Sequence, residues 1–264
     1  MIVDGRAIAG ELLSAVAEKT KKLSFTPKLG VITCAPGLET RQYLDLKQRK
    51  AKQVGIDLVV VELPIDASTE DCVACVERLS TSTHGVIVQL PLPASIDRER
   101  VLKAIPVNQD PDGFAYGENV QSVLPPVAAA INLISIKHQV EWKDKNIVVV
   151  GYGKLVGQPV AKYAETKGAE VTVITESSDD YFKIIKDADI LVLGVGQPHF
   201  ITGDLVKEGV VIFDAGASEE GGVVVGDADE STHNRASLVS PVPGGIGPIT
   251  VAALLDNLLK LIRQ

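Results

Sequence analysis

Short apolar runs rich in β-branched residues alternate along the chain with stretches whose apolar residues recur at helical spacing. The runs occupy residues 29–33, 58–63, 85–90, 147–151, 170–175, 190–195 and 210–214. Strands that alternate with helices form largely parallel sheets, and continuous apolar runs are typical of strands covered on both faces. The pattern therefore predicts an α/β protein.

The alternation breaks between residues 101 and 142, where Pro106, Asp110-Pro111-Asp112-Gly113 and Pro125-Pro126 precede a helix. Seven strands fit one sheet, but 264 residues exceed the usual size of one domain. We therefore predict a first domain over residues 1–125 and a second over 126–246. A last helix over 247–264 carries one apolar stripe, and periodicity alone does not say which domain it covers.

Composition mainly excludes classes of function. A net charge of −8 argues against wholesale nucleic-acid binding, which requires a basic face. The longest apolar runs are too short to cross a bilayer, and residues 1–4 do not begin a signal peptide. We therefore expect a cytoplasmic protein without nucleic-acid or membrane partners.

The chain contains three cysteines, an odd number that fits a reducing compartment. Cys72 and Cys75 form a C-x-x-C motif, but they follow Ser68 and Asp71, which resemble a capping box at the start of a helix. Redox or metal chemistry is the alternative, and no second Cys/His pair accompanies the motif. We interpret both cysteines as buried helix residues and predict no metal site.

A glycine-rich turn follows the strand at 147–151 and leads into a helix. Gly151 permits a tight turn, Gly153 lets the backbone approach a pyrophosphate, and Gly157 allows close helix packing. A phosphate then lies at the helix N-terminus. This motif predicts a Rossmann-type dinucleotide-binding domain, with cofactor contacts from Gly151, Tyr152, Gly153, Lys154, Leu155, Val156 and Gly157.

Glu176 ends the next predicted strand, where a ribose-binding acid is expected. A carboxylate accepts hydrogen bonds from ribose hydroxyls and repels a 2′-phosphate, so NAD is favoured over NADP. A bare turn with a surface glutamate is the alternative. The predicted cofactor site also includes Gly194, Val195, Gly196 and Gly216.

Residues 40–55 are predicted to form a helix with Thr40 as its N-cap and Gly55 as its end. Tyr43 and Lys47 share one face of this helix with apolar residues. Lys47 therefore either extends its ammonium group to solvent or is held in a site.

Four motifs together resemble the bifunctional methylenetetrahydrofolate dehydrogenase/methenyltetrahydrofolate cyclohydrolase family. They are Tyr43 with Lys47, the segment 85–93 with Gln89-Leu90-Pro91, the segment 110–114 with Asp112, and the segment 241–250 with Pro243-Gly244-Gly245. They stand in the family's order over nearly the whole chain.

The resemblance implies that the terminal helix completes the first domain, that folate lies in a cleft between two domains, and that the protein is a homodimer. It implies that Tyr43 stacks on the aminobenzoyl group, that Asp112 binds the pterin edge, and that Gln89 positions the catalytic Lys47. Leu90, Pro91, Pro243, Gly244 and Gly245 complete the predicted folate site. Taken singly, Asp112 and the Gly244-Gly245 loop are also explained as turns, and Gln89 as a group that satisfies the backbone at a strand end.

The implied chemistry is oxidation of a methylene group on tetrahydrofolate, followed by hydrolysis of the methenyl cation. Lys47 is expected to have a lowered pKa, because a permanently charged amine is poorly placed beside a cation.

The chain departs from the family mainly on the cofactor side. Tyr152-Gly153 stands where the family usually has Arg-Ser, residues 125–128 replace Pro-Cys-Thr-Pro, and Glu176-Ser177 replaces a pair such as His-Ser. Loss of the arginine and serine favours NAD. Three alternatives stay open: a cyclohydrolase with weak or no dehydrogenase activity, a non-catalytic folate- or dinucleotide-binding protein, and a hydroxy- or amino-acid dehydrogenase.

Overall fold

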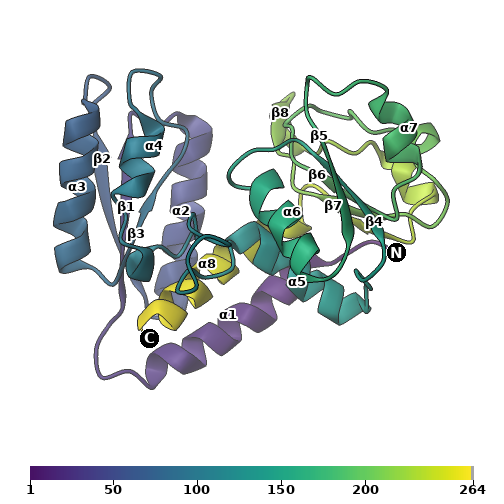
Figure 1. The fold of residues 1–264 in the computed structure, drawn as a ribbon. Helices are drawn as coiled ribbons and strands as arrows, with labels where there is room; N and C mark the ends of the chain where they lie inside the picture. Colours follow the sequence, from purple (N-terminus) through teal and green to yellow (C-terminus); the bar gives the residue numbers. More distant parts are fainter. Residues whose placement is uncertain (263–264) are drawn as a thin grey trace. The chain divides into compact units, whose positions relative to one another are not determined.

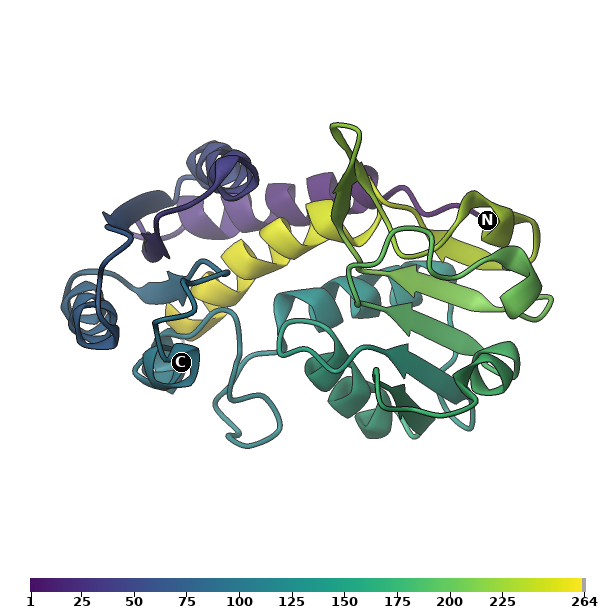
Figure 2. The same cartoon turned by 90° about the horizontal axis from the view of Figure 1, so that it is seen from above.

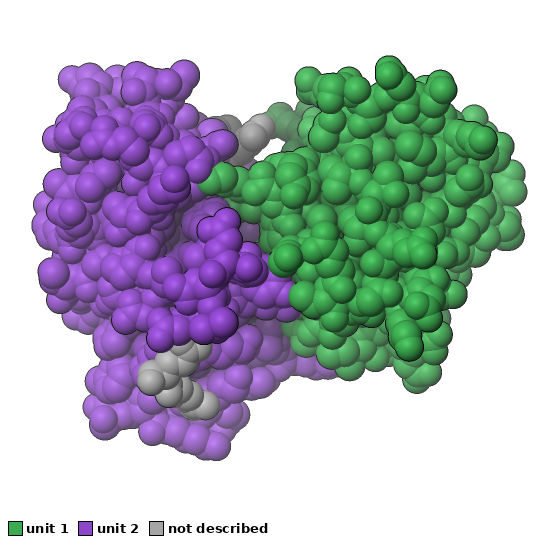
Figure 3. Space-filling model, viewed as in Figure 1, with its two compact units in different colours: residues 1–9, 127–250 green, residues 10–126, 251–264 purple. Residues whose placement is uncertain are grey.

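A computed structural model describes residues 1–262, apart from the side chains of residues 38 and 39. The chain forms two compact units, shown in different colours in Figure 3. Unit 1 comprises residues 1–9 and 127–250, and unit 2 comprises residues 10–126 and 251–264. Residues 263–264 of the predicted terminal helix lie outside the described residues.

Unit 2 is built on a parallel sheet of three strands in the order β2-β1-β3 (Figure 1). The strands are β1 (Lys28–Cys34), β2 (Asp57–Leu63) and β3 (Gly85–Val88). The helices are α1 (Gly5–Lys21), α2 (Leu38–Gln53), α3 (Thr69–Ser82), α4 (Arg98–Lys103) and α8 (Ile246–Ile262), with a 3-10 turn η1 (Val107–Gln109). Helices α1 and α8 begin in unit 1 and continue into unit 2.

The two faces of this sheet carry different helices. Ile32, Val86 and Val88 pack in one core cluster with residues of α3 and α4. Successive side chains of a strand point to opposite faces, so Gly85, Ile87 and Gln89 face the other side. A Cβ at Gly85 would lie 2.6 Å from Leu258 Cδ1, which places α8 on that second face.

Side-chain caps mark the starts of α3 and α4, whereas α2 begins without one. The Ser68 side chain and the Asp71 side chain make the predicted capping box at the start of α3. The prediction of Thr40 as the N-cap of α2 was wrong, because the helix begins at Leu38 and Gly37 occupies the cap without a side-chain hydrogen bond. Gly55 follows the end of α2 with φ +77°, as expected of a glycine that ends a helix.

Cys72 and Cys75 lie on α3 and are buried in the core, as their positions in a capped helix predicted. Both are free thiols, and burial raises the pKa of the Cys72 thiol. Across residues 1–262, no three His, Cys, Asp or Glu side chains are grouped so that they could bind a metal ion.

Unit 1 contains a parallel sheet of five strands in the order β10-β7-β6-β4-β5. The strands are β4 (Asn146–Val150), β5 (Glu170–Ile174), β6 (Ile190–Leu193), β7 (Val211–Asp214) and β10 (Leu238–Ser240). The helices are α5 (Pro126–His138), α6 (Gly157–Thr166) and α7 (Tyr181–Lys186), and the 3-10 turns are η2 (Gly203–Leu205) and η3 (Glu230–Asn234). In this sheet β4 lies between β5 on one side and β6 on the other, so the chain passes from β4 to β5 and then crosses to the opposite side of β4 to form β6. The order of strands therefore reverses at the carboxyl end of β4, which is where such sheets bind ligands.

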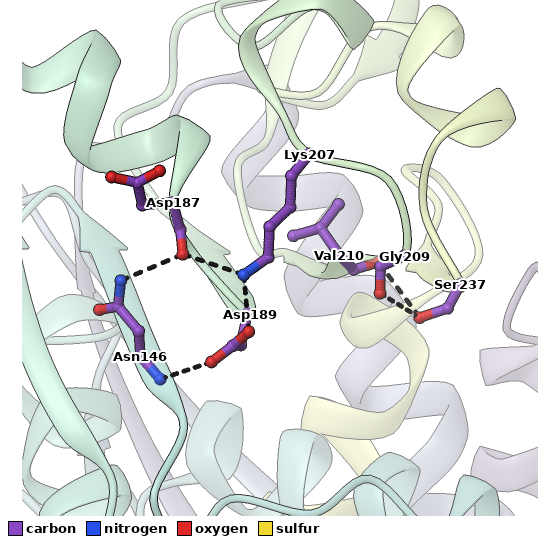
Figure 4. Close-up of polar contacts among 7 residues, drawn as sticks. All are labelled: Asn146, Asp187, Asp189, Lys207, Gly209, Val210 and Ser237. Atoms are coloured by element: carbon purple, nitrogen blue, oxygen red, sulfur yellow. Dashed lines mark hydrogen bonds and ion pairs between the residues drawn. The ribbon is translucent and has the colours of Figure 1, made fainter.

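The amino ends of these strands are joined by polar contacts, drawn in Figure 4. The Asn146 N–H donates to Asp189 Oδ2 at 2.9 Å, and Lys207 Nζ donates to Asp189 Oδ1 at 2.6 Å. Ser237 Oγ donates to the Gly209 carbonyl at 2.7 Å. These bonds connect the starts of β4, β6, β7 and β10, so this edge of the sheet is stabilised by its own side chains.

Three features of unit 1 have no counterpart in the predicted strands. A hairpin of β8 (Ser218–Glu220) and β9 (Val223–Val225) projects from the unit in Figure 2, and β10 adds a strand at the sheet edge. The first residues of the chain extend this edge, because Val3 N–H donates to the Val239 carbonyl at 2.9 Å.

None of the helices within residues 1–262 is both long and apolar enough to span a membrane.

Candidate active site

Lys47 lies on α2, and only 8% of it is exposed. Its Nζ donates to Gln89 Oε1 at 2.7 Å and stands 4.8 Å from the centre of the Tyr43 ring. Tyr43 precedes Lys47 by one helical turn, which brings the ring against the amine. The side chain is therefore held inside unit 2, and the alternative in which it extends to solvent was wrong.

The electrostatic surroundings of Lys47 favour its neutral form. Burial lowers the pKa of the amine because the charged form loses its hydration, and the nearby Asp112 carboxylate partly opposes this effect. The expected direction of the pKa is confirmed. An amine in this state can accept a proton closer to neutral pH than a lysine in water can.

Gln89 follows the last residue of β3, and both ends of its amide are engaged. Its backbone N–H donates to the Ile32 carbonyl at 2.7 Å, which continues the ladder between β3 and β1. Its Nε2 donates to the Leu90 carbonyl at 2.9 Å, so Oε1 is directed to Lys47. Gln89 thus satisfies a backbone group at the strand end and also holds the lysine.

The segment 110–114 separates a structural aspartate from one that faces the site. Asp110, 3% exposed, accepts N–H bonds from Asp112, Gly113 and Phe114 at 3.1, 3.0 and 2.6 Å. Burial raises its pKa to about 7. Asp110 makes the turn that the sequence also allowed for Asp112, and the Asp112 carboxylate interacts with Lys47.

Helix α8 fixes the position of this turn. Asn257 is fully buried, and its Nδ2 donates to the carbonyl oxygens of Pro111 and Leu124 at 3.0 and 2.8 Å. Burial raises the pKa of the Asp112 carboxyl, while Lys47 acts in the opposite direction. The polar groups around Lys47 are therefore positioned by two helices, a strand end and an aspartate-capped turn.

Thr33 lies beside this group in the sheet and was not singled out from the sequence. It follows Ile32, which is level with Val88, so Thr33 and Gln89 occupy neighbouring positions on the same face. Thr33 is 1% exposed. Its Oγ1 is buried and has no hydrogen-bond partner among the described residues. A periodic pattern does not reveal such a group, because a threonine fits a strand as well as a valine does.

The predicted folate residues are divided between the units. Tyr43, Lys47, Gln89, Leu90, Pro91 and Asp112 lie in unit 2. Pro243, Gly244 and Gly245 lie in unit 1, where the Gly245 N–H donates to the Pro241 carbonyl at 2.8 Å. The roles of all nine in substrate binding stay predictions.

The glycine turn after β4 leaves no space for other side chains at two positions. Gly151 has φ +92°, and a Cβ there would lie 2.7 Å from the Gly194 carbonyl oxygen. A Cβ at Gly157 would lie 2.0 Å from the Gly151 carbonyl oxygen, so the start of α6 packs directly against the turn. A Cβ at Gly153 would meet no atom within 4 Å, so its backbone is accessible.

Other predicted cofactor residues surround this turn in unit 1. The Gly151 N–H donates to the Ile174 carbonyl at 2.8 Å, so the ends of β4 and β5 are level and Glu176 is exposed just beyond them. A Cβ at Gly194 would lie 2.7 Å from Val156 Cγ1, which places the end of β6 against the same turn. Tyr152 and Leu155 are 51% and 45% exposed.

Two buried aspartates near these segments were missed from the sequence. Asp227 accepts N–H bonds from Val195, Gly196 and Gln197, and Asp214 accepts one from Gly216. Asp214 is the last residue of a predicted strand, a position that often carries function in parallel sheets. No comparable signal marks Asp227, because its partners are distant in sequence.

Comparison with known proteins matches both parts of the chain to domains of one family. Residues 3–112 match the family described as tetrahydrofolate dehydrogenase/cyclohydrolase, catalytic domain, and residues 125–264 match the NAD(P)-binding domain of the same description. The bifunctional protein FolD of Pelobacter propionicus is 36% identical over 276 residues, which cover 100% of this chain and 98% of the relative.

Solved structures agree with this assignment. The bifunctional FolD enzyme of Campylobacter jejuni superposes with a TM-score of 0.94 at 29% identity and covers 100% of this chain and 98% of its own. The FolD of Trypanosoma brucei, solved with NADP cofactor and an inhibitor, gives 0.92 at 30% identity, covering 100% and 97%. The chain belongs to the tetrahydrofolate dehydrogenase/cyclohydrolase family.

Proposed function

We propose that the protein oxidises 5,10-methylenetetrahydrofolate to the 5,10-methenyl form with a nicotinamide dinucleotide, and hydrolyses the methenyl form to 10-formyltetrahydrofolate. The observation that carries this proposal is the buried lysine held by Gln89, Tyr43 and Asp112 in a chain of this family. A hydroxy- or amino-acid dehydrogenase does not require a neutral lysine beside a glutamine and an aromatic ring.

In the first reaction the bound dinucleotide supplies a hydride acceptor, and the protein aligns it with the methylene carbon. Six of the nine predicted folate residues lie in unit 2. The Tyr43 ring provides a flat contact for the aminobenzoyl group, and the Asp112 carboxyl exchanges hydrogen bonds with the pterin edge. Loss of hydride leaves a methenyl cation bonded to both folate nitrogens.

In the second reaction water adds to this cation. Neutral Lys47 accepts a proton from the water as the carbon–oxygen bond forms, and Gln89 Oε1 keeps the amine directed by its hydrogen bond. The proton then passes to the folate nitrogen whose bond to the carbon breaks. The hydroxyl becomes the formyl oxygen, and its proton is released to solvent.

We propose that the protein uses NAD in preference to NADP. The support is the position of Glu176 two residues after the end of β5, where its negative charge disfavours a 2′-phosphate. Tyr152 and Gly153 at the glycine turn contribute no positive charge that would attract that phosphate.

We also propose a homodimer. Strand β2 is at the edge of the unit 2 sheet and exposes Val59 and Val60 by 37% and 41%. An apolar edge strand of this kind is suited to pairing with a second copy of itself. Sedimentation of the purified protein and of Val60→Lys tests this, and a wild-type monomer at micromolar concentration contradicts it.

The experiment that tests the activity measures initial rates with NAD and with NADP on 5,10-methylenetetrahydrofolate, while methenyl formation and hydrolysis are followed in parallel. We expect NADH formation with little NADPH, together with methenyl hydrolysis. Hydrolysis without reduction of either dinucleotide would leave a cyclohydrolase alone. A protein that binds folate and dinucleotide but catalyses neither reaction would contradict the proposal.

A further inference from the structure

The buried Asp227 carboxylate accepts hydrogen bonds from the backbone of residues 195–197, which include two predicted cofactor contacts. It is fully buried and accepts three successive N–H groups, those of Val195 and Gly196 on Oδ2 at 2.8 and 3.2 Å and that of Gln197 on Oδ1 at 2.8 Å. Consecutive N–H groups directed at one point form an anion-binding concavity. In this protein the anion is a side chain of the chain itself.

The hairpin β8–β9 accounts for the position of Asp227. The chain leaves the sheet after β7, turns back at the hairpin visible in Figure 2, and returns through Gly226 and Asp227. The His199 N–H donates to the Gly226 carbonyl at 3.1 Å, and the Ile201 N–H donates to the Asp227 carbonyl at 2.9 Å. The returning segment is thus bonded along its length to the segment that follows β6.

Asp214 extends the same network to two more segments. Its Oδ1 accepts the Gly216 N–H and its Oδ2 accepts the Ala228 N–H, both at 2.9 Å. Its backbone N–H donates to Ser240 Oγ at 2.8 Å, directly before the 241–245 loop. The two aspartates therefore connect the segments 194–197, 214–216 and 240–245.

The packing around both carboxylates requires glycine. A Cβ at Gly216 would lie 2.2 Å from Asp227 Cγ, and a Cβ at Gly226 would lie 2.2 Å from Asp214 Oδ2. Burial raises the pKa of Asp214 to about 6 and raises that of Asp227, and the proximity of Asp227 contributes to the first effect. Two like charges inside a unit oppose folding, so fold stability alone does not explain this pair.

We propose that Asp227 and Asp214 are positioning residues of the dinucleotide site, which hold the backbone of 194–197 and 214–216 in its binding conformation before the dinucleotide arrives. This inference rests on the proposed function, because residues 194–196 and 216 are predicted cofactor contacts. The inference goes beyond that function because it names the two carboxylates that hold the backbone of these residues in place. A preformed backbone binds more tightly because less freedom is lost on binding.

The test compares Asp227→Asn with Asp229→Asn. The amide introduced by Asp227→Asn retains one acceptor oxygen and places an NH₂ group against an N–H donor, so the 195–197 segment loses part of its support. Asp229 lies two residues away, is half-buried, and accepts the Ser231 N–H at 2.8 Å as the cap of η3, with its Oδ2 3.7 Å from His199 Nδ1. The control therefore makes the same carboxylate-to-amide change at a cap that does not bond to the cofactor segments, and its amide Oδ1 can still accept the Ser231 N–H.

The first readout is the Kd for NAD and NADP by calorimetry, with KM and kcat for the better dinucleotide. We expect Asp227→Asn to weaken binding about 10- to 100-fold, mainly through KM, and Asp229→Asn to stay within about threefold of wild type. Methenyl hydrolysis without dinucleotide reports the folding of unit 2, because Lys47, Gln89 and Asp112 all lie there. Equal Kd values for Asp227→Asn and wild type would overturn the inference and leave the proposed function intact. Wild type that binds neither dinucleotide would overturn the proposed function.

The second readout uses wild type alone and applies even if Asp227→Asn does not fold. Hydrogen exchange at the amides of Val195, Gly196 and Gln197 should be slow without dinucleotide and should change little when NAD is added. Fast exchange that slows only with NAD would show that the ligand orders the segment, and would refute a preformed site.

Discussion

Replacing Lys47 by methionine removes the amine and keeps an unbranched side chain of similar length. The variant loses the 2.7 Å bond to Gln89 Oε1 and the interaction with Asp112, while the contact with the Tyr43 ring remains. Gln89 Oε1 then lacks this donor and the half-buried Asp112 loses the neighbouring amine, at a cost of at most about 1–3 kcal/mol. Burial of an apolar side chain in place of a desolvated amine offsets that cost, so we expect the unfolding free energy to change by no more than about 2 kcal/mol.

The two activities should respond very differently to this change. A positioned general base contributes about 10²- to 10⁴-fold, so methenyl hydrolysis should fall by that factor. Hydride transfer moves no proton to Lys47, so methylene oxidation should fall by about tenfold at most, through poorer alignment of the folate.

The assay follows methenyl disappearance in a buffer series and, separately, NADH formation. The wild-type hydrolysis rate should rise with pH along a limb that lies below 10.5, the ordinary lysine pKa, because burial favours the neutral amine. The limb should be absent from Lys47→Met. Lys50→Met is the control on the same helix, because Lys50 Nζ donates to Oε1 of the exposed Gln53 at 3.4 Å, away from Gln89. Hydrolysis by Lys47→Met within about threefold of wild type, or an equal loss of both activities, would refute the assignment of Lys47 as the base.

Three further predictions follow from the described contacts. Glu176→Gln should narrow the preference for NAD by about tenfold, measured as the ratio of kcat/KM for NAD and NADP, and an unchanged ratio would exclude a role in cofactor choice. Thr33→Val should raise the unfolding free energy by about 1 kcal/mol in urea denaturation, because it removes the unpartnered Oγ1, and a loss of stability would reveal a partner for that oxygen. The pKa of Asp214 is raised from 3.8 to about 6, so its contribution to stability is present below pH 4 and lost as the pH rises through 6. The stability of wild type relative to Asp214→Asn should therefore fall by about 3 kcal/mol between pH 4 and 7, followed by the fluorescence of Trp142, the single tryptophan, and a constant difference would contradict the raised pKa.

Local and periodic features of the sequence were sufficient for the framework. The apolar runs located the strands that became β1 to β7, because buried strands such as β1 and β6 carry a continuous apolar signal. The run at β2 gave the same signal although β2 is an exposed edge strand. The capping box at Ser68 and the glycine at 55 marked helix ends correctly because each acts on its own neighbourhood. Periodicity marked Lys47 only as a lysine among apolar residues, and its hydrogen-bond partner Gln89 comes 42 residues later, directly after β3.

The features that were not predicted depend on partners distant in sequence. Asp110 and Asp112 have the same side chain two residues apart, and only the fold shows that the first makes the turn and the second faces Lys47. Asp227 bonds to residues about 30 positions earlier, and the short strands β8 and β9 that return the chain to them carry little periodic signal. The pairing of Val3 with Val239 joins opposite ends of the sequence.

The contrast between the two edges of the unit 1 sheet indicates what its buried charges are for. At the amino ends of the strands, Asp189 is paired with Lys207 and with the Asn146 N–H, and these contacts lower the pKa of its carboxyl, so this edge is stabilised by its charge (Figure 4). At the carboxyl ends, Asp214 and Asp227 have no cation among their hydrogen-bond partners in the described chain, and their pKa values are raised. A fold selected for stability alone would neutralise these carboxylates or replace them with apolar residues. The backbone geometry that they impose on the glycine segments is the compensating gain, and a binding site is where such a cost is retained.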